Sequence, residues 1–420
     1  MKTTSLRWNG RSGATGLAVL VAAGLAACDR EGRGSTETDG GPLVLDASDV
    51  HILGTSDAIA TVEDLEVLPD GTVWVLNSVE PFFVGFGADG EVLQTRGRSG
   101  GGPGELQEPA GFTDGGIDGA AWALDVGRHA FLQVSGPDTT SREIAIPPDP
   151  IRPGTVLGGM NLLSRRVRTA RMEGEIVLPR ASIEGEIPAT SYWYYGWSPD
   201  LVALNFSTDE VRTVVRLAEI LGDPRPSLLT GEYPPFPLWY RLWGVCGADE
   251  IRVYDQIQNQ IRGFTSEGVE REPTALPPPS YEEVTPRQFA RATFDLGAVE
   301  RMGQVPPGPI QVTAADSAQI IQRITSRVTQ SPEDLASLLP MYVDYRCDGA
   351  GTQWIQPIDL DIGGLRGGPI WLRLSPDGGA QEVRFPDRFD AYRFTSERVW
   401  EVQRDELGVA SVAWIDLVEA

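Results

Sequence analysis

The sequence is almost without lysine. Its 35 basic residues include a single lysine, Lys2, which lies at the extreme N-terminus. The rest of the chain therefore has no lysine for a Schiff base, a phosphate-binding loop or a general base. Histidine is nearly as scarce, since His51 and His129 are the only two, and this pair does not support a histidine-rich zinc site.

Basic charge is in short supply overall. The 59 acidic residues outnumber the 35 basic ones, and the formal net charge is −24. Nucleic acid is excluded as a partner, because its phosphates would need a basic surface to neutralise them. The acidity is typical of a soluble protein. It leaves an oxygen-only Ca²⁺ site open, but no EF-hand spacing occurs, so we assign no metal ligand and no cofactor.

The sequence also lacks an apolar run long enough to cross a bilayer. Residues 14–27 form a 14-residue apolar segment after a basic start, which predicts a signal peptide over 1–27. The segment ends in Leu-Ala-Ala before Cys28 and resembles a bacterial lipobox, in which the cysteine is lipidated and becomes the mature N-terminus. The alternative is an ordinary secretory signal cleaved before an incidental cysteine.

The segment after Cys28 is polar. Residues 29–41 contain no apolar side chain, so 28–41 are predicted to be the lipidated cysteine and a flexible tether. The remainder, 42–420, is expected to fold as one domain. The lipid would hold it at a membrane of a bacterial cell envelope, in the periplasm or outside the cell.

Glycine and proline are abundant, and the turns they form recur at fixed offsets. Between residues 62 and 112, Asp-Gly turns separate short β-branched and aromatic runs, which predicts a four-stranded antiparallel sheet. The segment DGTVWVLN at 70–77 recurs 48 residues later as DGAAWALD, and an offset of 178 takes Asn77 to Asp255. A repeated sheet that cannot bury its faces alone indicates a repeat architecture.

Six such units are predicted. More divergent units cover 154–220 and 341–386, and the last unit, 389–417, has only three strands. The strand at 49–55 supplies the missing fourth. We therefore expect an all-β fold, a closed six-bladed β-propeller with four-stranded antiparallel blades, whose last blade is completed by the N-terminal strand.

The pattern changes to helix over about 280–339. Capping boxes begin at Ser280 and Thr285, and an apolar stripe runs through Ile320, Ile321 and Ile324. This predicts a helical insertion between blades four and five. It would act either as a cap over one mouth of the ring or as a side brace.

Two segments carry a resemblance to a known family. Residues 124–134, LDVGRHAFLQV, resemble the NHL repeat, and 97–111 resemble the loop that joins consecutive NHL blades. The family's six-bladed propeller agrees with the unit count. Together with the lipobox, the chain resembles bacterial six-bladed β-propeller lipoproteins. The resemblance implies that the His129 ring braces a turn by hydrogen bonding, while His51 is expected on the closing strand, partly exposed.

Loops on a rigid scaffold are where binding residues gather. Arg96, Arg98, Glu105 and Arg128 are expected on the face that carries the loops between blades, and they form our candidate ligand mouth. Solvated surface charges are the alternative. The glycine-rich stretch 97–104 has neither the Gly-Lys-Ser/Thr of a P-loop nor dinucleotide spacing, so its glycines are assigned to a turn.

The two remaining cysteines occupy equivalent positions. Cys246 lies nine residues before Asp255, and Cys347 lies nine before Gln356, so both fall at the same point of the first strand in adjacent blades. In an oxidising, exported setting a disulfide between them and two buried thiols stay open as alternatives. The aromatic stretches 192–197 and 239–243 are assigned to packing between blades, with sugar or peptide stacking as the alternative.

These observations favour a non-enzymatic binding or scaffolding module for an unknown protein, peptide or small ligand, and no catalytic residue is assigned. The alternative is an enzyme, a propeller lyase or hydrolase that uses a divalent cation in the central channel. Propellers host many functions, so the fold alone does not decide between the two.

Overall fold

A computed structural model describes residues within the compact unit Thr36–Ala420. The described residues are 41–102, 104–135, 142–147, 168–183, 197–217, 220, 242–255, 258–277, 284–291, 314–329, 341–360, 368–387 and 389–417. The predicted signal peptide and Cys28 lie outside these ranges. No helix within the described ranges is both long and apolar enough to cross a membrane.

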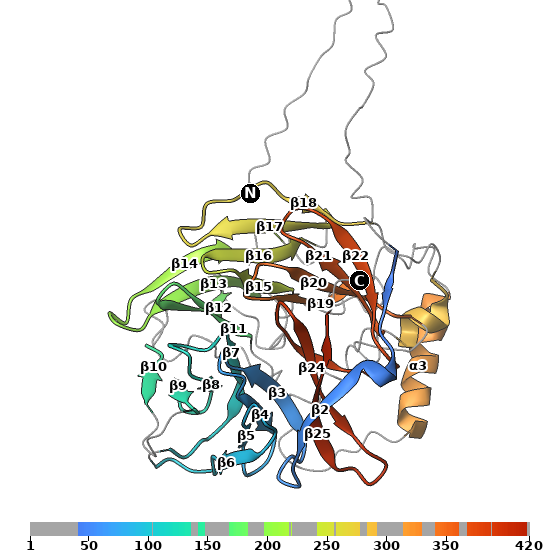
Figure 1. Ribbon diagram of the computed structural model, residues 1–420. Coiled ribbons are helices and arrows are strands. Elements are labelled where there is room, and N and C mark those ends of the chain that lie inside the picture. Colours follow the sequence, from blue (N-terminus) through green and yellow to red (C-terminus); the bar gives the residue numbers. More distant parts are fainter. Residues whose placement is uncertain are drawn as a thin grey trace, which may run out of the picture. The chain divides into compact units, whose positions relative to one another are not determined.

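The described chain is all-β and propeller-like, with few helices, and its strands form antiparallel runs of four that we call meanders 1 to 6 (Figure 1). Meander 1 contains β3 (Val62–Val67), β4 (Val73–Asn77), β5 (Phe83–Phe86) and β6 (Val92–Arg96). Meander 2 contains β7 (Pro109–Asp114), β8 (Trp122–Asp125), β9 (Ala130–Gln133) and β10 (Glu143–Ala145). Meander 3 contains β11 (Thr169–Met172), β12 (Glu175–Ile183), β13 (Trp197–Asn205) and β14 (Val211–Arg216).

The second half of the chain repeats the arrangement. Meander 4 contains β15 (Trp243–Cys246), β16 (Glu250–Asp255), β17 (Gln260–Thr265) and β18 (Thr274–Ala275). Meander 5 contains β19 (Tyr342–Cys347), β20 (Gln353–Pro357), β21 (Ile370–Leu374) and β22 (Ala380–Arg384). Meander 6 contains β23 (Ala391–Phe394), β24 (Arg398–Arg404), β25 (Ala410–Asp416) and β2 (Val50–Thr55).

The predicted turns close these strands. Gly71 has a φ of 84°, which only glycine adopts readily, and the Asp70 carboxylate accepts a hydrogen bond from the backbone N–H of Thr72 at 2.9 Å. The β5–β6 turn repeats the arrangement with Asp89 and Gly90, whose φ is 85°. Local turn chemistry therefore sets the hairpin register.

The apolar core lies between meanders. In the described residues each of six buried clusters joins two consecutive meanders, because both faces of a sheet must be covered. Trp74 and Leu76 of meander 1 pack with Phe112 of meander 2. Val75 of meander 1 packs in turn with Trp400 of meander 6, so the series of contacts returns to its start.

The first strands of the meanders lie innermost (Figure 1). β23 contacts β3, β3 contacts β7, β7 contacts β11, β11 contacts β15, and β15 contacts β19. Meanders 2 and 3 belong to one eight-stranded sheet, because β7 and β11 pair in parallel at Thr113–Thr169 and Asp114–Ala170. By hydrogen bonding the described strands therefore make five sheets.

The N-terminal strand completes meander 6. β2 pairs with β25 in antiparallel fashion, as the sequence predicts, and His51 lies opposite Trp414. β2 also runs very close to the β5–β6 turn of meander 1. A Cβ on Gly90 would lie 1.8 Å from the Leu53 carbonyl oxygen, so only glycine fits at this junction. A second short strand, β1 (Leu43–Val44), pairs in parallel with β22 and was not predicted.

Helix occurs between β18 and β19 in the chain order. α3 spans Ala314–Val328, and residues 286–291 are also helical. The capping box predicted at Thr285 is present, because its hydroxyl accepts the Gln288 N–H at 3.2 Å and Gln288 Oε1 accepts the Thr285 N–H at 3.1 Å. Phe289 is fully buried in the core shared by meanders 4 and 5, and Ile324 packs against that core. The described helical residues therefore contact the core between meanders 4 and 5.

The predicted unit at 154–220 is described only from residue 168 onward. Its first described strand is β11, which is the first strand of meander 3. The observed strand is only four residues long and connects to β12 through the two-residue turn Glu173-Gly174, in which Gly174 has a φ of 77°. The short tight hairpin fixes the register there.

Candidate functional site

Charged side chains on the innermost strands form a buried network. Arg393 of β23 donates to Asp114 Oδ1 at 2.6 Å and to the Leu65 carbonyl oxygen at 3.2 Å, and its guanidinium also binds the Glu66 carboxylate. One side chain of meander 6 thereby connects meanders 1 and 2. We call this group, together with the residues of the next paragraph, the axial network.

A second guanidinium continues the axial network. Arg168, which immediately precedes β11, donates to Asp344 Oδ1 at 3.0 Å and to the Trp243 carbonyl oxygen at 2.7 Å, and it also binds the carbonyl of Tyr345. Its Nε lies 4.0 Å from Asp114 Oδ2. Meanders 2 to 5 are therefore connected through Arg168, and all six meanders contribute to the axial network.

Burial and charge pairing act in opposite directions on these carboxylates. Burial raises the pKa of Glu66 to about 8, although the neighbouring Arg393 lowers it. Burial would also raise the pKa of Asp114, but Arg393 and Arg168 outweigh it and hold that pKa below its usual value. Asp114 is thus the ionised centre between two guanidinium groups, an arrangement that positions strands.

The axial network offers little to a cation. Its carboxylates face guanidinium groups, including Arg346, whose Nη2 lies 3.2 Å from Asp344 Oδ2. Within the ranges described, no three His, Cys, Asp or Glu side chains are grouped so that they could hold a metal ion. Sequence reasoning missed this network, although a charged residue recurs within the apolar first strands.

A pocket of about 360 Å³ lies between meanders 1 and 2. Two of the four predicted mouth residues, Arg96 and Arg98, line it. The other lining residues come from β5 and the residues just before it, from β6 and the loop after it, and from the end of β9 and the residue that follows it: Pro81, Phe83, Thr95, Gly97, Gly104, Leu106, Leu132, Gln133 and Val134. We call this cavity the inter-meander pocket.

Glu105 and Arg128, the other two predicted mouth residues, build the loop beside the pocket. The Glu105 carboxylate accepts the Gly102 N–H at 2.7 Å and pairs with Arg98 at 2.7 Å. The Gly102 N–H and, more weakly, Arg98 lower the pKa of Glu105. Arg128 donates to the carbonyl oxygens of Gly102 at 2.7 Å and Glu105 at 3.0 Å, so it holds the loop from the second meander.

The glycines of this loop enclose the carboxylate of Glu105. A Cβ on Gly100 would lie 2.0 Å from Glu105 Oε2, and one on Gly102 would lie 3.0 Å from it. Gly97 and Gly104 have φ values of 82° and 74°, as an inter-blade turn requires. The stretch therefore serves a turn, and the anion that it surrounds belongs to the chain itself.

The expected role of the His129 ring is corrected. His129 is exposed with a φ of 56°, and among the described contacts its backbone, rather than its ring, closes the turn by donating to the Val126 carbonyl and accepting from Ile146. Asn259 stands at the equivalent position of the β16–β17 turn with a φ of 51°. What these positions share is a left-handed backbone, which Asn, Asp and His tolerate better than most residues.

His51 lies on β2, as expected, with about half of its side chain exposed. Its ring stacks on Trp414 with 5.4 Å between centroids, and its Nε2 lies 3.5 Å from Asp416 Oδ2. Of the predicted aromatic stretches, Trp243 is fully buried in the core between meanders 3 and 4. Residues 192–196 and 239–241 lie outside the described ranges.

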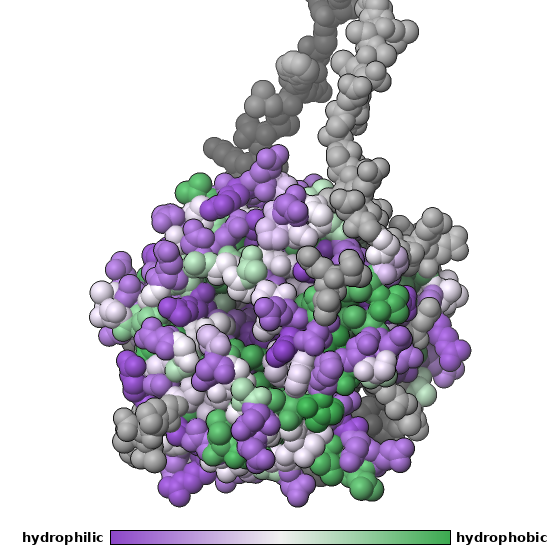
Figure 2. Space-filling view, in the orientation of Figure 1, coloured by the Kyte–Doolittle hydropathy of each residue, from purple (hydrophilic) through white to green (hydrophobic). Residues whose placement is uncertain are grey.

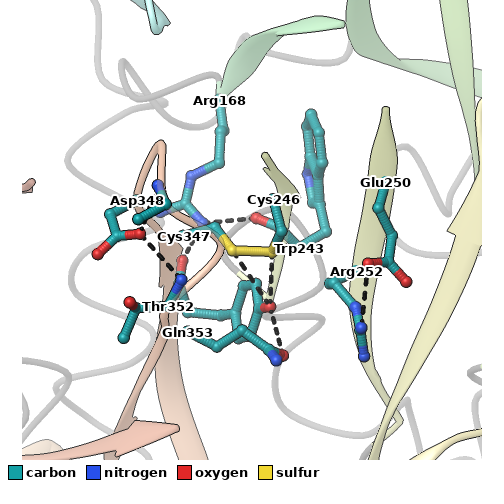
Figure 3. Close-up of a disulfide and its surroundings, with 11 residues drawn as sticks. Arg168, Trp243, Cys246, Glu250, Arg252, Cys347, Asp348, Thr352 and Gln353 are labelled. Atoms are coloured by element: carbon teal, nitrogen blue, oxygen red, sulfur yellow. Dashed lines mark hydrogen bonds and ion pairs between the residues drawn. A yellow bond between two sulfur atoms is a disulfide. The ribbon is translucent and has the colours of Figure 1, made fainter. Parts of the chain in front are cut away.

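A disulfide joins Cys246 and Cys347, whose Cα atoms are 5.2 Å apart (Figure 3). The two cysteines end β15 and β19, the first strands of consecutive meanders. The buried Tyr345 hydroxyl lies 3.3 Å from Cys246 Sγ and donates to Gln353 Oε1 at 2.9 Å. Arg168 also donates hydrogen bonds to carbonyl oxygens of the same two strands. Meanders 4 and 5 are therefore joined by a disulfide and through a shared guanidinium group.

The surface around these features is mixed. Figure 2 shows a face on which hydrophilic residues alternate with small apolar patches. Such scattered apolar residues are normal for a soluble surface. The inter-meander pocket is our candidate ligand site among the described residues.

No protein-family model matches the chain, and no curated protein matches it. Solved structures that resemble it include a virginiamycin B lyase from Staphylococcus aureus (TM-score 0.39, 10% identity, 88% of this chain and 99% of that one). Others are a gluconolactonase from Xanthomonas campestris (0.42, 10%, 90% and 95%) and a member of the DUF4221 family from Bacteroides vulgatus (0.45, 10%, 88% and 96%). These values are too low to carry an argument about activity.

Proposed function

We propose that the chain is a lipid-anchored protein of the bacterial cell envelope, that its six meanders are the blades of one closed propeller, and that it binds a ligand without catalysing a reaction. The ligand site is the inter-meander pocket. The chain would belong with the bacterial six-bladed β-propeller lipoproteins that it resembles, and its helical segment would brace blades four and five.

The proposed closure is supported by packing and pairing at the ends of the chain. β2 completes meander 6, and the core between meanders 6 and 1 is built like the other five described cores. Arg393 adds a buried charged connection from meander 6 to meander 1. A ring closed in this way leaves few exposed strand edges.

The proposed address is supported by the sequence alone. The basic start, the short apolar run and the small residues before Cys28 match a lipoprotein signal, and residues 29–41 supply a polar tether. Several acyl chains on one cysteine would hold the protein firmly at a membrane, since each buried methylene contributes about 0.8 kcal/mol.

The observation that carries the ligand-binding proposal is the pocket itself. Its volume of about 360 Å³ falls within the range of small-molecule sites, roughly 300–1,000 Å³. Apolar side chains from both meanders line it together with the polar side chains of Thr95 and Gln133. Two predicted residues, Arg96 and Arg98, line it as well.

The alternative, a lyase or hydrolase with a divalent cation in the central channel, is less well supported. Carboxylates would have to bind that cation, and those of the axial network already face Arg168, Arg346 and Arg393. Replacing a guanidinium partner by a cation would leave a buried positive charge unpaired, which is costly.

Photo-crosslinking in the native envelope tests the binding proposal. A photoreactive amino acid replaces the exposed, pocket-lining Thr95 in the full lipidated chain, and the same residue at Leu407, which is 90% exposed in meander 6, serves as the control. We expect one ligand to be captured at position 95 and not at 407. Equal capture at both positions, or capture at neither, would contradict the proposal.

A further inference from the structure

We infer that the inter-meander pocket selects a small ligand with an apolar body and one carboxylate. The inference rests on the proposed ligand-binding function and adds the chemical class of the ligand. It comes from the charge, the wall composition and the hydrogen bonding of the pocket.

The charged residues that line the pocket are opposite in sign to the net charge of the chain. Acidic residues outnumber basic ones by 59 to 35 in the sequence, yet none of the lining residues is acidic and two of them are arginines. A ligand cation would find no carboxylate among the lining groups. An anion would find Arg96 and Arg98 at one side of the cavity.

Arg98 is the group that is placed to meet the ligand. Its side chain is 75% exposed, and its guanidinium pairs with Glu105. Glu105 is held independently, because its other oxygen accepts the Gly102 N–H. Arg98 can therefore turn toward a ligand while the Glu105 carboxylate keeps a hydrogen bond.

Arg96 contributes charge with less freedom. Its Nε donates to Gln94 at 2.7 Å, and its Nη1 donates to the Val134 carbonyl oxygen at 2.9 Å. A single exposed guanidinium matches a single carboxylate, which it can bind through two parallel hydrogen bonds. A phosphate dianion would call for more donors than this pocket brings to one point.

The remaining lining residues include four apolar side chains beside the polar Thr95 and Gln133. Phe83, Leu106, Leu132 and Val134 line the cavity from both meanders, and all four belong to the core between meanders 1 and 2. Contact with these side chains would remove apolar ligand surface from water. Arginine at one side and apolar side chains from both meanders favour a carboxylate with an apolar body.

Titration calorimetry on the full lipidated chain in phospholipid nanodiscs tests the inference. The probes are 3-phenylpropionate, its neutral counterpart 3-phenylpropanol, its cationic counterpart 3-phenylpropylamine, and phenylethyl phosphate. We expect 3-phenylpropionate to bind with one site per chain and more tightly than the other three. Equal or tighter binding of the alcohol, the amine or the phosphate would overturn the inference.

Two variants are expected to act in opposite directions. Arg98→Gln should weaken binding of 3-phenylpropionate roughly 10- to 100-fold, because a charged hydrogen-bonding partner is lost. Glu105→Gln should tighten it about threefold, since it removes the charge that competes for Arg98 and keeps an acceptor for the Gly102 N–H. The control Arg271→Gln removes an exposed arginine paired with Glu250 in meander 4 and should change nothing.

The outcomes separate the inference from the proposal beneath it. If both pocket variants weaken binding, these side chains act only on loop structure, and the charge argument is wrong. If the neutral or cationic probe binds best and Gln133→Trp, which fills the pocket, abolishes that binding, the ligand class is wrong while the binding function stands. If no probe binds and Thr95 captures nothing in the envelope, the proposed function itself fails.

Discussion

Replacing Arg393 by methionine should show how strongly the axial network holds the meanders together. Methionine keeps much of the apolar stem but leaves Asp114, Glu66 and the Leu65 carbonyl without their guanidinium partner. Removing one partner of a buried ion pair usually costs about 3–5 kcal/mol in the free energy of unfolding. At pH 6 we expect a loss of about 3 kcal/mol, measured by urea denaturation.

The loss should grow in alkaline solution. Arg393 lowers the pKa of Glu66, which is about 8 in the parent protein, so the variant's Glu66 has a still higher pKa. A carboxyl whose folded pKa is raised loses stabilisation as pH rises, until the folded form ionises. The free energy of unfolding of the parent stops falling at about pH 8, whereas that of the variant falls further. The difference between the two proteins should therefore grow by up to about 1.4 kcal/mol at pH 9.

Two further variants make this result specific. Adding Glu66→Gln to Arg393→Met should abolish the extra loss at pH 9, because the titrating carboxyl is gone. Arg271→Met, at a half-exposed ion pair in meander 4, should change the free energy of unfolding by less than about 0.5 kcal/mol. A loss below about 1 kcal/mol for Arg393→Met, or one independent of pH, would refute the reasoning.

The remaining predictions concern other parts of the chain. Burial raises the pKa of Glu401 to about 7, so the free energy of unfolding of the parent should fall by up to about 3 kcal/mol between pH 4.5 and 7. Urea denaturation of Glu401→Gln should not show this fall, and equal pH dependence of the two proteins would contradict the prediction. Reducing the Cys246–Cys347 disulfide should lower the free energy of unfolding by about 2–4 kcal/mol, and thiol titration of the unfolded, unreduced chain should find neither cysteine free. Cys28→Ala should abolish acyl labelling, and the mature chain should no longer be recovered in the membrane fraction. Continued labelling would exclude the lipobox.

The features that could be predicted from the sequence are those set by local chemistry. Asp70-Gly71 forms its turn with residues only a few positions away, so its strands follow directly from the sequence. The strand at 49–55 was predicted because three strands at 389–417 required a fourth, and β2 fills that place. The positions of Cys246 and Cys347 followed from the repeat register, which places both at the ends of first strands.

The features that were missed depend on contacts between distant residues. Arg393 and Glu66 are 327 positions apart, and nothing in either local segment identifies the other as its partner. Arg96 and Arg98 were expected at a ligand mouth because they flank a glycine-rich turn; both line the inter-meander pocket, and their role in binding stays a prediction. That the glycines enclose the Glu105 carboxylate depends on the folded path of the loop. The expected role of the His129 ring failed because the turn needs a backbone conformation and leaves the side chain exposed.

Hydrogen–deuterium exchange with and without 3-phenylpropionate, on the full chain in nanodiscs, tests the central claim most directly. The claim is that ligand binds between meanders 1 and 2 and not at the centre of the ring. We predict slower exchange in peptides that cover residues 95–106 and 131–134, with unchanged exchange in β3, β11 and β19. Protection of those first strands without protection at 95–106 would contradict the account and favour a site in the central channel.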